Sequence, residues 1–147
     1  LYQSNNFSKI DYQDYLQHLS QSLLDSYGQP NQDISLHIDA HAIQFNLETA
    51  IPLGLIINEA VTNSLKHGFK DRTEGILKIS VELMEKEFYK MTIEDNGIGI
   101  PKDFNLEKSK SLGTNLMNKL VRQLEGNVTV ESGYSGTALH FLFKQID

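Results

Sequence analysis

The sequence has no cysteine and no tryptophan, and only three of its 147 residues are prolines. Without cysteine, disulfide bonds, thiolate chemistry and cysteine-ligated zinc are excluded. No apolar run approaches the roughly 20 residues that a transmembrane helix needs, and no signal peptide is visible at the start. The chain begins with Leu1 rather than methionine. We therefore expect a cytoplasmic piece of a larger protein, whose sensor or membrane anchor would lie upstream.

Positive charge is also scarce in this chain. Lys and Arg number 13 against 19 Asp and Glu, which gives a formal net charge of −6. This balance argues against nucleic acid or an anionic membrane surface as the main partner. The length and the hydrophobic content of 39% are typical of one globular domain with its own core. An anionic ligand would therefore need local basic groups and backbone amides.

Hydrophobic periodicity predicts helices that alternate with strands. One helix is expected from its N-cap Asp11 to Gly28, a second starts after Thr49 and stops at Gly68, and a third ends at Gly126. Because the strands arrive in hairpins with helices between them, we expect a sheet covered on one face by helices. The strands are predicted at residues 34–38, 42–47 (weaker), 77–83, 89–95, 127–132 and 137–143, and residues 100–111 form a polar linker.

Four polar side chains of the second helix share one face. Residues three and four apart in a helix lie on the same side, so Glu59, Asn63, Lys66 and His67 fall within an arc of roughly 100°. The Asn63 amide oxygen can bind Mg²⁺, and Glu59 can orient a water or a hydroxyl. Lys66 can neutralise phosphate charge, and His67 can flank a ribose or phosphates. A solvated helix face is the alternative, but the helix is largely apolar and its polar residues need partners.

Asp95 is expected on the apolar face of its strand. Counting in steps of two from Tyr89 through Met91 and Ile93 reaches this carboxylate, where an unpaired charge would be costly. A carboxylate only accepts hydrogen bonds, so it selects an amine such as the 6-amino group of adenine, for about 1.5 to 3 kcal/mol. The glycines at 97 and 99 allow close approach of a flat ring. The alternative interpretation is an ordinary turn after a strand.

Two further signals are weaker. The segment Ser111–Asn115 opens the third helix, and free amides at a helix start can bind phosphate. Thr137 lies in step with Leu139 and Phe141, so its buried hydroxyl needs a bond, for example to Asp95 or to the base. Many helices begin with such residues, however, and a threonine in a strand is common.

Taken together, in this order and spacing, the motifs resemble the catalytic ATP-binding domain of sensor histidine kinases, in the superfamily that includes DNA gyrase, MutL and a heat-shock chaperone. Leu1–Ser4 and Ile10–Tyr15 resemble the junction after the dimerisation helices. The resemblance therefore spans nearly the whole chain. The matching boxes are Asn58–His67 (asparagine box), Asp95–Pro101 (first glycine box), Leu112–Leu116 (second glycine box) and Gly136–Ala138 (Gly-Thr motif).

The resemblance implies a Bergerat-type two-layer α/β sandwich with a mixed, mostly antiparallel sheet. Residues 1–10 would be the end of a dimerisation helix or linker, and 11–147 the ATP-binding catalytic domain. Glu59 would act near the metal and its water. The other implied roles are Asn63 for Mg²⁺, Lys66 and His67 for the phosphates and ribose, Asp95 for the adenine amine, Thr137 in support of Asp95, Gly97, Gly99 and Ile100 for the adenine pocket, and Leu112, Gly113 and Thr114 for the lid hinge.

The sequence departs from the family pattern around the lid. Ser111 stands where many relatives have the first glycine of the second box, and Thr114 replaces a common leucine. The hinge is therefore expected to be stiffer. Phe104 is the only aromatic candidate in the short lid, residues 100–111, and it matches poorly.

The resemblance implies transfer of the γ-phosphoryl group of Mg-ATP to a histidine and then to a response-regulator aspartate, in a homodimeric parent protein. None of the histidines at 18, 37, 41, 67 and 140 has the sequence context of a family acceptor. We expect the acceptor in an upstream dimerisation domain, so that this chain binds ATP without phosphorylating itself.

Two other functions stay open. One is an anti-sigma-type serine kinase or an ATP-hydrolysing machine of the same superfamily, and the other is a non-catalytic nucleotide-binding module. P-loop and eukaryotic-type kinase mechanisms are disfavoured, because neither Gly-x-x-x-x-Gly-Lys-Ser/Thr nor Gly-x-Gly-x-x-Gly occurs.

Overall fold

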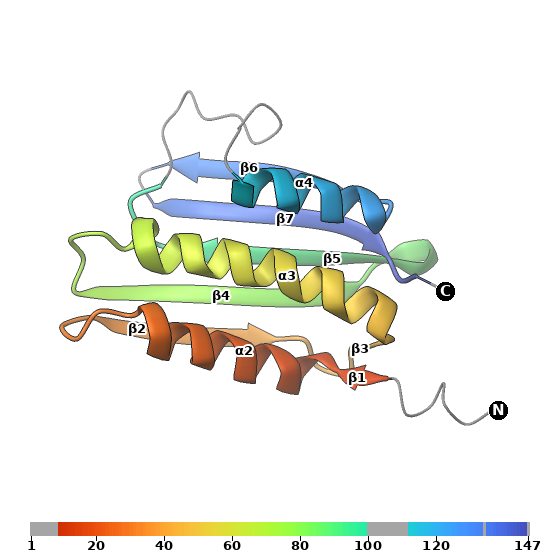
Figure 1. The fold of residues 1–147 in the computed structure, drawn as a ribbon, viewed down its shortest axis with the longest axis horizontal. Helices are drawn as coiled ribbons and strands as arrows, with labels where there is room; N and C mark the ends of the chain where they lie inside the picture. The colour runs from red at the N-terminus through yellow and green to blue at the C-terminus, as the bar shows by residue number, and fades with distance from the viewer. Residues whose placement is uncertain (1–8, 100–111, 134, 147) are drawn as a thin grey trace.

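A computed structural model describes residues 9–99, 112–133 and 135–146. Its helices lie side by side on one face of a five-stranded sheet (Figure 1). The strand order is β2-β4-β5-β7-β6, with β2 parallel to β4 and every other pair antiparallel. This arrangement confirms the predicted fold class. The strands are β2 Asp33–Asp39, β4 Glu74–Leu83, β5 Phe88–Asp95, β6 Asn127–Gly133 and β7 Gly136–Lys144.

The helices begin at capping residues. Helix α2 (Tyr12–Tyr27) starts as predicted, since the Asp11 carboxylate accepts a hydrogen bond from the Gln13 amide at 3.0 Å. Helix α3 (Leu47–Asn63) starts earlier than predicted, because the Asn46 side chain accepts from the Thr49 amide at 3.0 Å. The predicted start after Thr49 was therefore wrong. Helix α4 spans Leu112–Gln123, so it begins in the segment predicted to open it and ends three residues before the predicted stop at Gly126.

The weaker strand expected at residues 42–47 is much shorter in the structure. Strand β3 (Gln44–Phe45) pairs antiparallel with β1 (Ile10–Asp11), outside the five-stranded sheet. It ends after two residues because the next residue, Asn46, already caps α3. In the part of the chain that the structure describes, no helix is long and apolar enough to cross a membrane.

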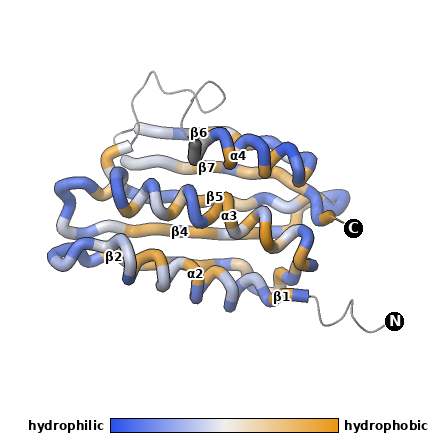
Figure 2. The backbone as a smooth tube through the Cα atoms, in the orientation of Figure 1, coloured by the Kyte–Doolittle hydropathy of each residue, from blue (hydrophilic) through white to orange (hydrophobic). Residues whose placement is uncertain are grey.

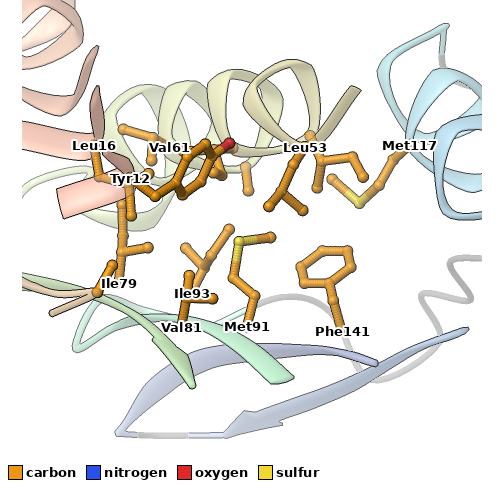
Figure 3. Close-up of a cluster of buried hydrophobic side chains, with 14 of the residues drawn as sticks. Tyr12, Leu16, Leu53, Val61, Ile79, Val81, Met91, Ile93, Met117 and Phe141 are labelled. Atoms are coloured by element: carbon orange, nitrogen blue, oxygen red, sulfur yellow. The ribbon is translucent and has the colours of Figure 1, made fainter. Parts of the chain in front are cut away.

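One hydrophobic core fills the space between the helices and the sheet (Figure 3). Much of β4 and α3 is hydrophobic (Figure 2), and the buried residues of both elements belong to this core. Each fully buried large side chain contributes about 1.5 to 3 kcal/mol. Tyr12 is fully buried and donates its hydroxyl to the Ala50 carbonyl at 3.1 Å, and burial raises the pKa of this hydroxyl. Helix residues such as Leu16, Leu53 and Val61 meet Ile79, Val81, Met91, Ile93 and Phe141 of the sheet.

The start of α3 is bound to the C-terminal end of the described chain. The Ile146 amide donates to the Thr49 hydroxyl at 2.7 Å, and the Asn46 amide donates to the Gln145 side chain at 3.0 Å. The Asn46 side chain also donates to the Ile146 carbonyl. One asparagine therefore caps the helix and holds the tail.

Replacing Asn46 by alanine should remove both functions. We expect a loss of about 2 kcal/mol in the free energy of unfolding, since a lost cap costs about 1 kcal/mol and the tail bond adds to it. Urea unfolding of the wild type, Asn46→Ala and Asp11→Ala measures this. Asp11 is a cap without a tail contact, so equal losses for the two variants would contradict the role given to the tail.

Candidate functional site

The predicted motifs meet at one end of the sheet. The C-terminal end of α3, the last residues of β5 and the start of β7 all lie there, and α4 runs from this side toward the other end (Figure 1). Strand β1 and the end of β7, near which the described chain begins and ends, lie at the opposite end (Figure 1). The fold therefore brings together motifs that lie far apart in the sequence and that were predicted one by one.

The Asp95 carboxylate is held by two donors from the protein. Its Oδ2 atom accepts from the Ser64 hydroxyl at 2.6 Å, and its Oδ1 atom accepts from the Gly97 amide at 2.9 Å. Asp95 is half-buried and follows the buried Met91 and Ile93 on the same face of β5, as predicted. A carboxylate has about four acceptor positions, and the described residues fill two of them with these bonds.

A wide helical turn, η1 (Ser64–Gly68), carries α3 onto the first glycine box. Its π-helical bond runs from the Phe69 amide to the Ser64 carbonyl at 3.1 Å. The Gly68 carbonyl then accepts from the Ile98 amide at 2.8 Å. A Cβ atom on Gly97 would lie only 2.0 Å from the Gly68 carbonyl oxygen. Glycine is therefore needed at 97 because the two boxes are in backbone contact.

The turn after β5 is also bound to the neighbouring strand. The Asn96 side chain accepts from the Ile76 amide at 2.7 Å, and the Asn96 amide donates to the Ile76 carbonyl at 3.2 Å. Arg72 donates to the Asn96 carbonyl at 3.3 Å. Gly99 has a φ of 80°, which favours glycine. The turn that follows Asp95 is thus held to β4 and to the segment before it.

The other predicted helix residues surround the end of α3. Asn63 is exposed, and none of the described residues forms a hydrogen bond with its side chain. Its amide oxygen is therefore accessible and of a type that Mg²⁺ accepts. Glu59 is half-buried one turn earlier, and His67 is exposed. The Lys66 ammonium lies 4.9 Å from the centre of the Tyr27 ring of α2, a partner that the sequence did not suggest.

Thr137 lies directly opposite Asp95 in the register of β5 and β7. Its hydroxyl is 3.4 Å from the Ser132 hydroxyl. Within the described residues, Thr137 forms no hydrogen bond with the Asp95 carboxylate. Its support of Asp95 or of a base stays a prediction. A cavity of about 280 Å³ at this end is lined in part by Asp95, Ser132, Gly136 and Thr137.

Part of the predicted site lies outside the described residues. Ile100, Phe104 and Ser111 fall in this part, as do the side chains of Leu112 and Thr114 and the burial of Gly113. The roles given to these residues at the lid and the adenine pocket stay predictions.

A sequence profile of the histidine kinase-, DNA gyrase B- and HSP90-like ATPases matches residues 48–146. The chain belongs to this ATPase family. The family profile, a solved histidine kinase domain of similar fold and a histidine kinase of similar sequence confirm the resemblance to histidine kinase catalytic domains. The matched range contains the asparagine box, both glycine boxes and the Gly-Thr motif, so we refer to the chain below as the ATPase domain.

Similar proteins include a histidine kinase and an anti-sigma factor. Blue-light-activated histidine kinase 2 of Erythrobacter litoralis (strain HTCC2594) is 33% identical over 107 residues, which are 73% of this chain and 31% of that protein. Anti-sigma F factor of Bacillus cereus (strain G9842) is 41% identical over 64 residues, 44% of this chain and 41% of that protein. The ATPase domain thus spans less than half the length of these curated relatives.

The fold comparison agrees with the sequence comparison. The histidine kinase domain of the Erythrobacter litoralis EL346 blue-light activated histidine kinase has a TM-score of 0.83 with this chain at 29% identity. The match covers 92% of this chain and 62% of that chain.

Sequence reasoning missed several residues that build the site of the ATPase domain. Ser64 binds Asp95 from the wide turn, Gly68 leaves room beside the Asp95 carboxylate, and Asn96 holds the strand end. One signal was available for Ser64, because a carboxylate on an apolar face needs a donor and the buried side of the neighbouring helix offers a hydroxyl.

Proposed function

We propose that this ATPase domain is the catalytic domain of a two-component sensor histidine kinase. It binds Mg-ATP and transfers the γ-phosphoryl group to a histidine upstream of this chain, for relay to a response-regulator aspartate. The observation that carries the proposal is the Asp95 carboxylate, which is fixed by Ser64 and Gly97 and keeps acceptor positions for an amine.

Each site residue has a role that its position supports. Asp95 accepts from the adenine 6-amino group, and the glycines at 97 and 99 let the ring approach the backbone. Asn63 holds Mg²⁺, which when bound neutralises phosphate charge, and Glu59 orients the accepting group or a water. Catalysis of this kind rests mainly on positioning and charge stabilisation.

Lys66 must change partner to reach the phosphates. Its ammonium now lies over the Tyr27 ring, a contact of about 0.5 to 1 kcal/mol at an exposed site. A charge-assisted bond to a phosphate oxygen is stronger than this contact. The exchange is therefore favourable, and Tyr27 holds the lysine near the site until nucleotide binds.

The position of the N-terminal end limits how the acceptor histidine can reach the site. The described chain begins at the end of the domain opposite Asp95 (Figure 1). Helix α3 runs between these ends with 17 residues, or about 26 Å. The upstream dimerisation segment must therefore fold back along the domain or present the histidine of a second subunit, as a homodimeric parent protein permits.

A serine kinase is the second candidate, and the similarity to anti-sigma F factor supports it. The phosphorylated product distinguishes the two functions, since phosphohistidine is labile in acid and phosphoserine is stable. The family alone cannot separate them, because both kinds of protein are similar to this chain.

The isolated chain should bind Mg-ATP at one site but take up no acid-labile phosphate. Calorimetric titration measures the binding, and incubation with γ-labelled ATP measures the uptake. The same assay on the chain joined to its upstream segment should show acid-labile label. Absence of binding would overturn the ATP assignment, and acid-labile label on the isolated chain would contradict an upstream acceptor.

A further inference from the structure

Ser64 holds the Asp95 carboxylate, but the function proposed above gives it no effect on which nucleotide the site selects. It follows Asn63 in the chain, and only 9% of the residue is exposed. Its hydroxyl lies 2.6 Å from Asp95 Oδ2, within the range of short bonds between a hydroxyl and a charged carboxylate. A bond of this kind constrains both partners.

The two protein donors act on different oxygens of the carboxylate. With only the Gly97 amide on Oδ1, the carboxyl plane could still turn about the bond between Cβ and Cγ. The Ser64 hydroxyl on Oδ2 supplies a second restraint, so that rotation of the carboxyl plane would weaken both bonds. The open acceptor positions then keep one direction, which is what recognition of a single amine requires.

The residues around Ser64 leave room for its bond to Asp95 and hold its backbone in place. A Cβ atom on Gly68 would lie 3.1 Å from Asp95 Oδ2, so a larger residue there would crowd the oxygen that Ser64 binds. The Ser64 carbonyl is occupied by the Phe69 amide in the wide turn at 3.1 Å. The backbone of Ser64 is thereby held, and its side chain is directed at Asp95.

We propose that Ser64 is a positioning residue that sets the preference of this site for 6-aminopurine nucleotides, by fixing the plane of the Asp95 carboxylate. The proposal rests on the nucleotide-binding function proposed above. It assigns Ser64 an effect on selectivity rather than on phosphoryl transfer.

The test compares ATP with purine riboside triphosphate, which carries hydrogen in place of the 6-amino group. The measured quantity is the ratio of the two dissociation constants, each with Mg²⁺ present. The wild type should prefer ATP by a factor on the order of 10 to 100, the range of one charge-assisted hydrogen bond. In Ser64→Ala this preference should fall roughly fivefold, mainly through weaker ATP binding.

Ser20→Ala is the matched control. Ser20 is fully buried in α2, and its hydroxyl has no hydrogen-bond partner among residues 9–99, 112–133 and 135–146. Its removal should leave the ratio unchanged. Ser64→Thr keeps the hydroxyl and should retain most of the preference for ATP.

The outcomes separate this inference from the function on which it rests. If Ser64→Ala keeps the wild-type ratio of dissociation constants and Asp95→Asn has no preference for ATP, the role of Ser64 is overturned but the ATP site is supported. A ratio that is unchanged in Asp95→Asn as well would contradict the proposed function itself. If Ser64→Ala binds neither nucleotide, recovery of the preference in Ser64→Thr supports the inference, and its absence there overturns it.

Discussion

Replacing Asp95 by asparagine is expected to weaken Mg-ATP binding by about 100-fold. The wild-type carboxylate receives the Ser64 hydroxyl and the Gly97 amide on different oxygens, and in the proposed site an adenine amine as well. An asparagine side chain has one oxygen and one NH₂ group. The NH₂ group must face Ser64, Gly97 or the adenine amine, so at least one donor loses its acceptor. Losses of about 1.5 to 3 kcal/mol per charge-assisted bond give the expected factor.

Calorimetric titration with Mg-ATP measures this change, and urea unfolding shows how much of it comes from lower stability. Asp39→Asn is the matched control, because Asp39 is exposed at the last residue of β2, on an edge strand of the sheet. That variant should bind Mg-ATP like the wild type. Equal affinity of the wild type and Asp95→Asn would remove the central assignment of the site.

The position of Asp95 could be predicted because a strand alternates its faces strictly. Once Met91 and Ile93 are known to be buried, the residue at 95 must point to the same face, whatever follows in the chain. The same rule predicted the face of β7 that carries Phe141. Local periodicity therefore gave most of the sheet and placed the main site residue on its correct side.

Contacts between distant segments could not be predicted in this way. Thr49 and Asn46 are both good capping residues, and the choice of Asn46 is stabilised by Ile146, 100 positions later in the chain. The wide turn η1 has no sequence signature, so the bond from Ser64 to Asp95 was not expected. The contact between Lys66 and Tyr27 likewise depends on how α2 packs beside α3.

The two glycines of the first box show what the sequence left undecided. Both were expected to allow close approach, but they differ in physical cause. Gly99 has a positive φ, whereas Gly97 has no room for a side chain because the Gly68 carbonyl lies against it. The distinction matters because a crowded position and a left-handed position respond differently to substitution.

Gly97→Ala is expected to abolish Mg-ATP binding and to lower the free energy of unfolding by about 3 kcal/mol or more. The added Cβ atom would lie 2.0 Å from the Gly68 carbonyl oxygen and 3.1 Å from Asp95 Oδ1. The nearer atom belongs to the backbone, so no side-chain rotation can relieve the contact. Either η1 or the turn after β5 must move, and each movement separates Asp95 from Ser64 or from the Gly97 amide.

Gly133→Ala separates this effect from a general cost of replacing glycine near the sheet end. A Cβ atom on Gly133 would meet nothing within 4 Å, and this variant should unfold and bind Mg-ATP like the wild type. Urea unfolding and calorimetric titration on both variants give the comparison. Normal binding by Gly97→Ala would mean that the contact between the asparagine box and the first glycine box can open without loss of the site. The carboxylate would then be positioned by its strand alone, because the backbone contact at Gly68 would no longer be needed to hold it.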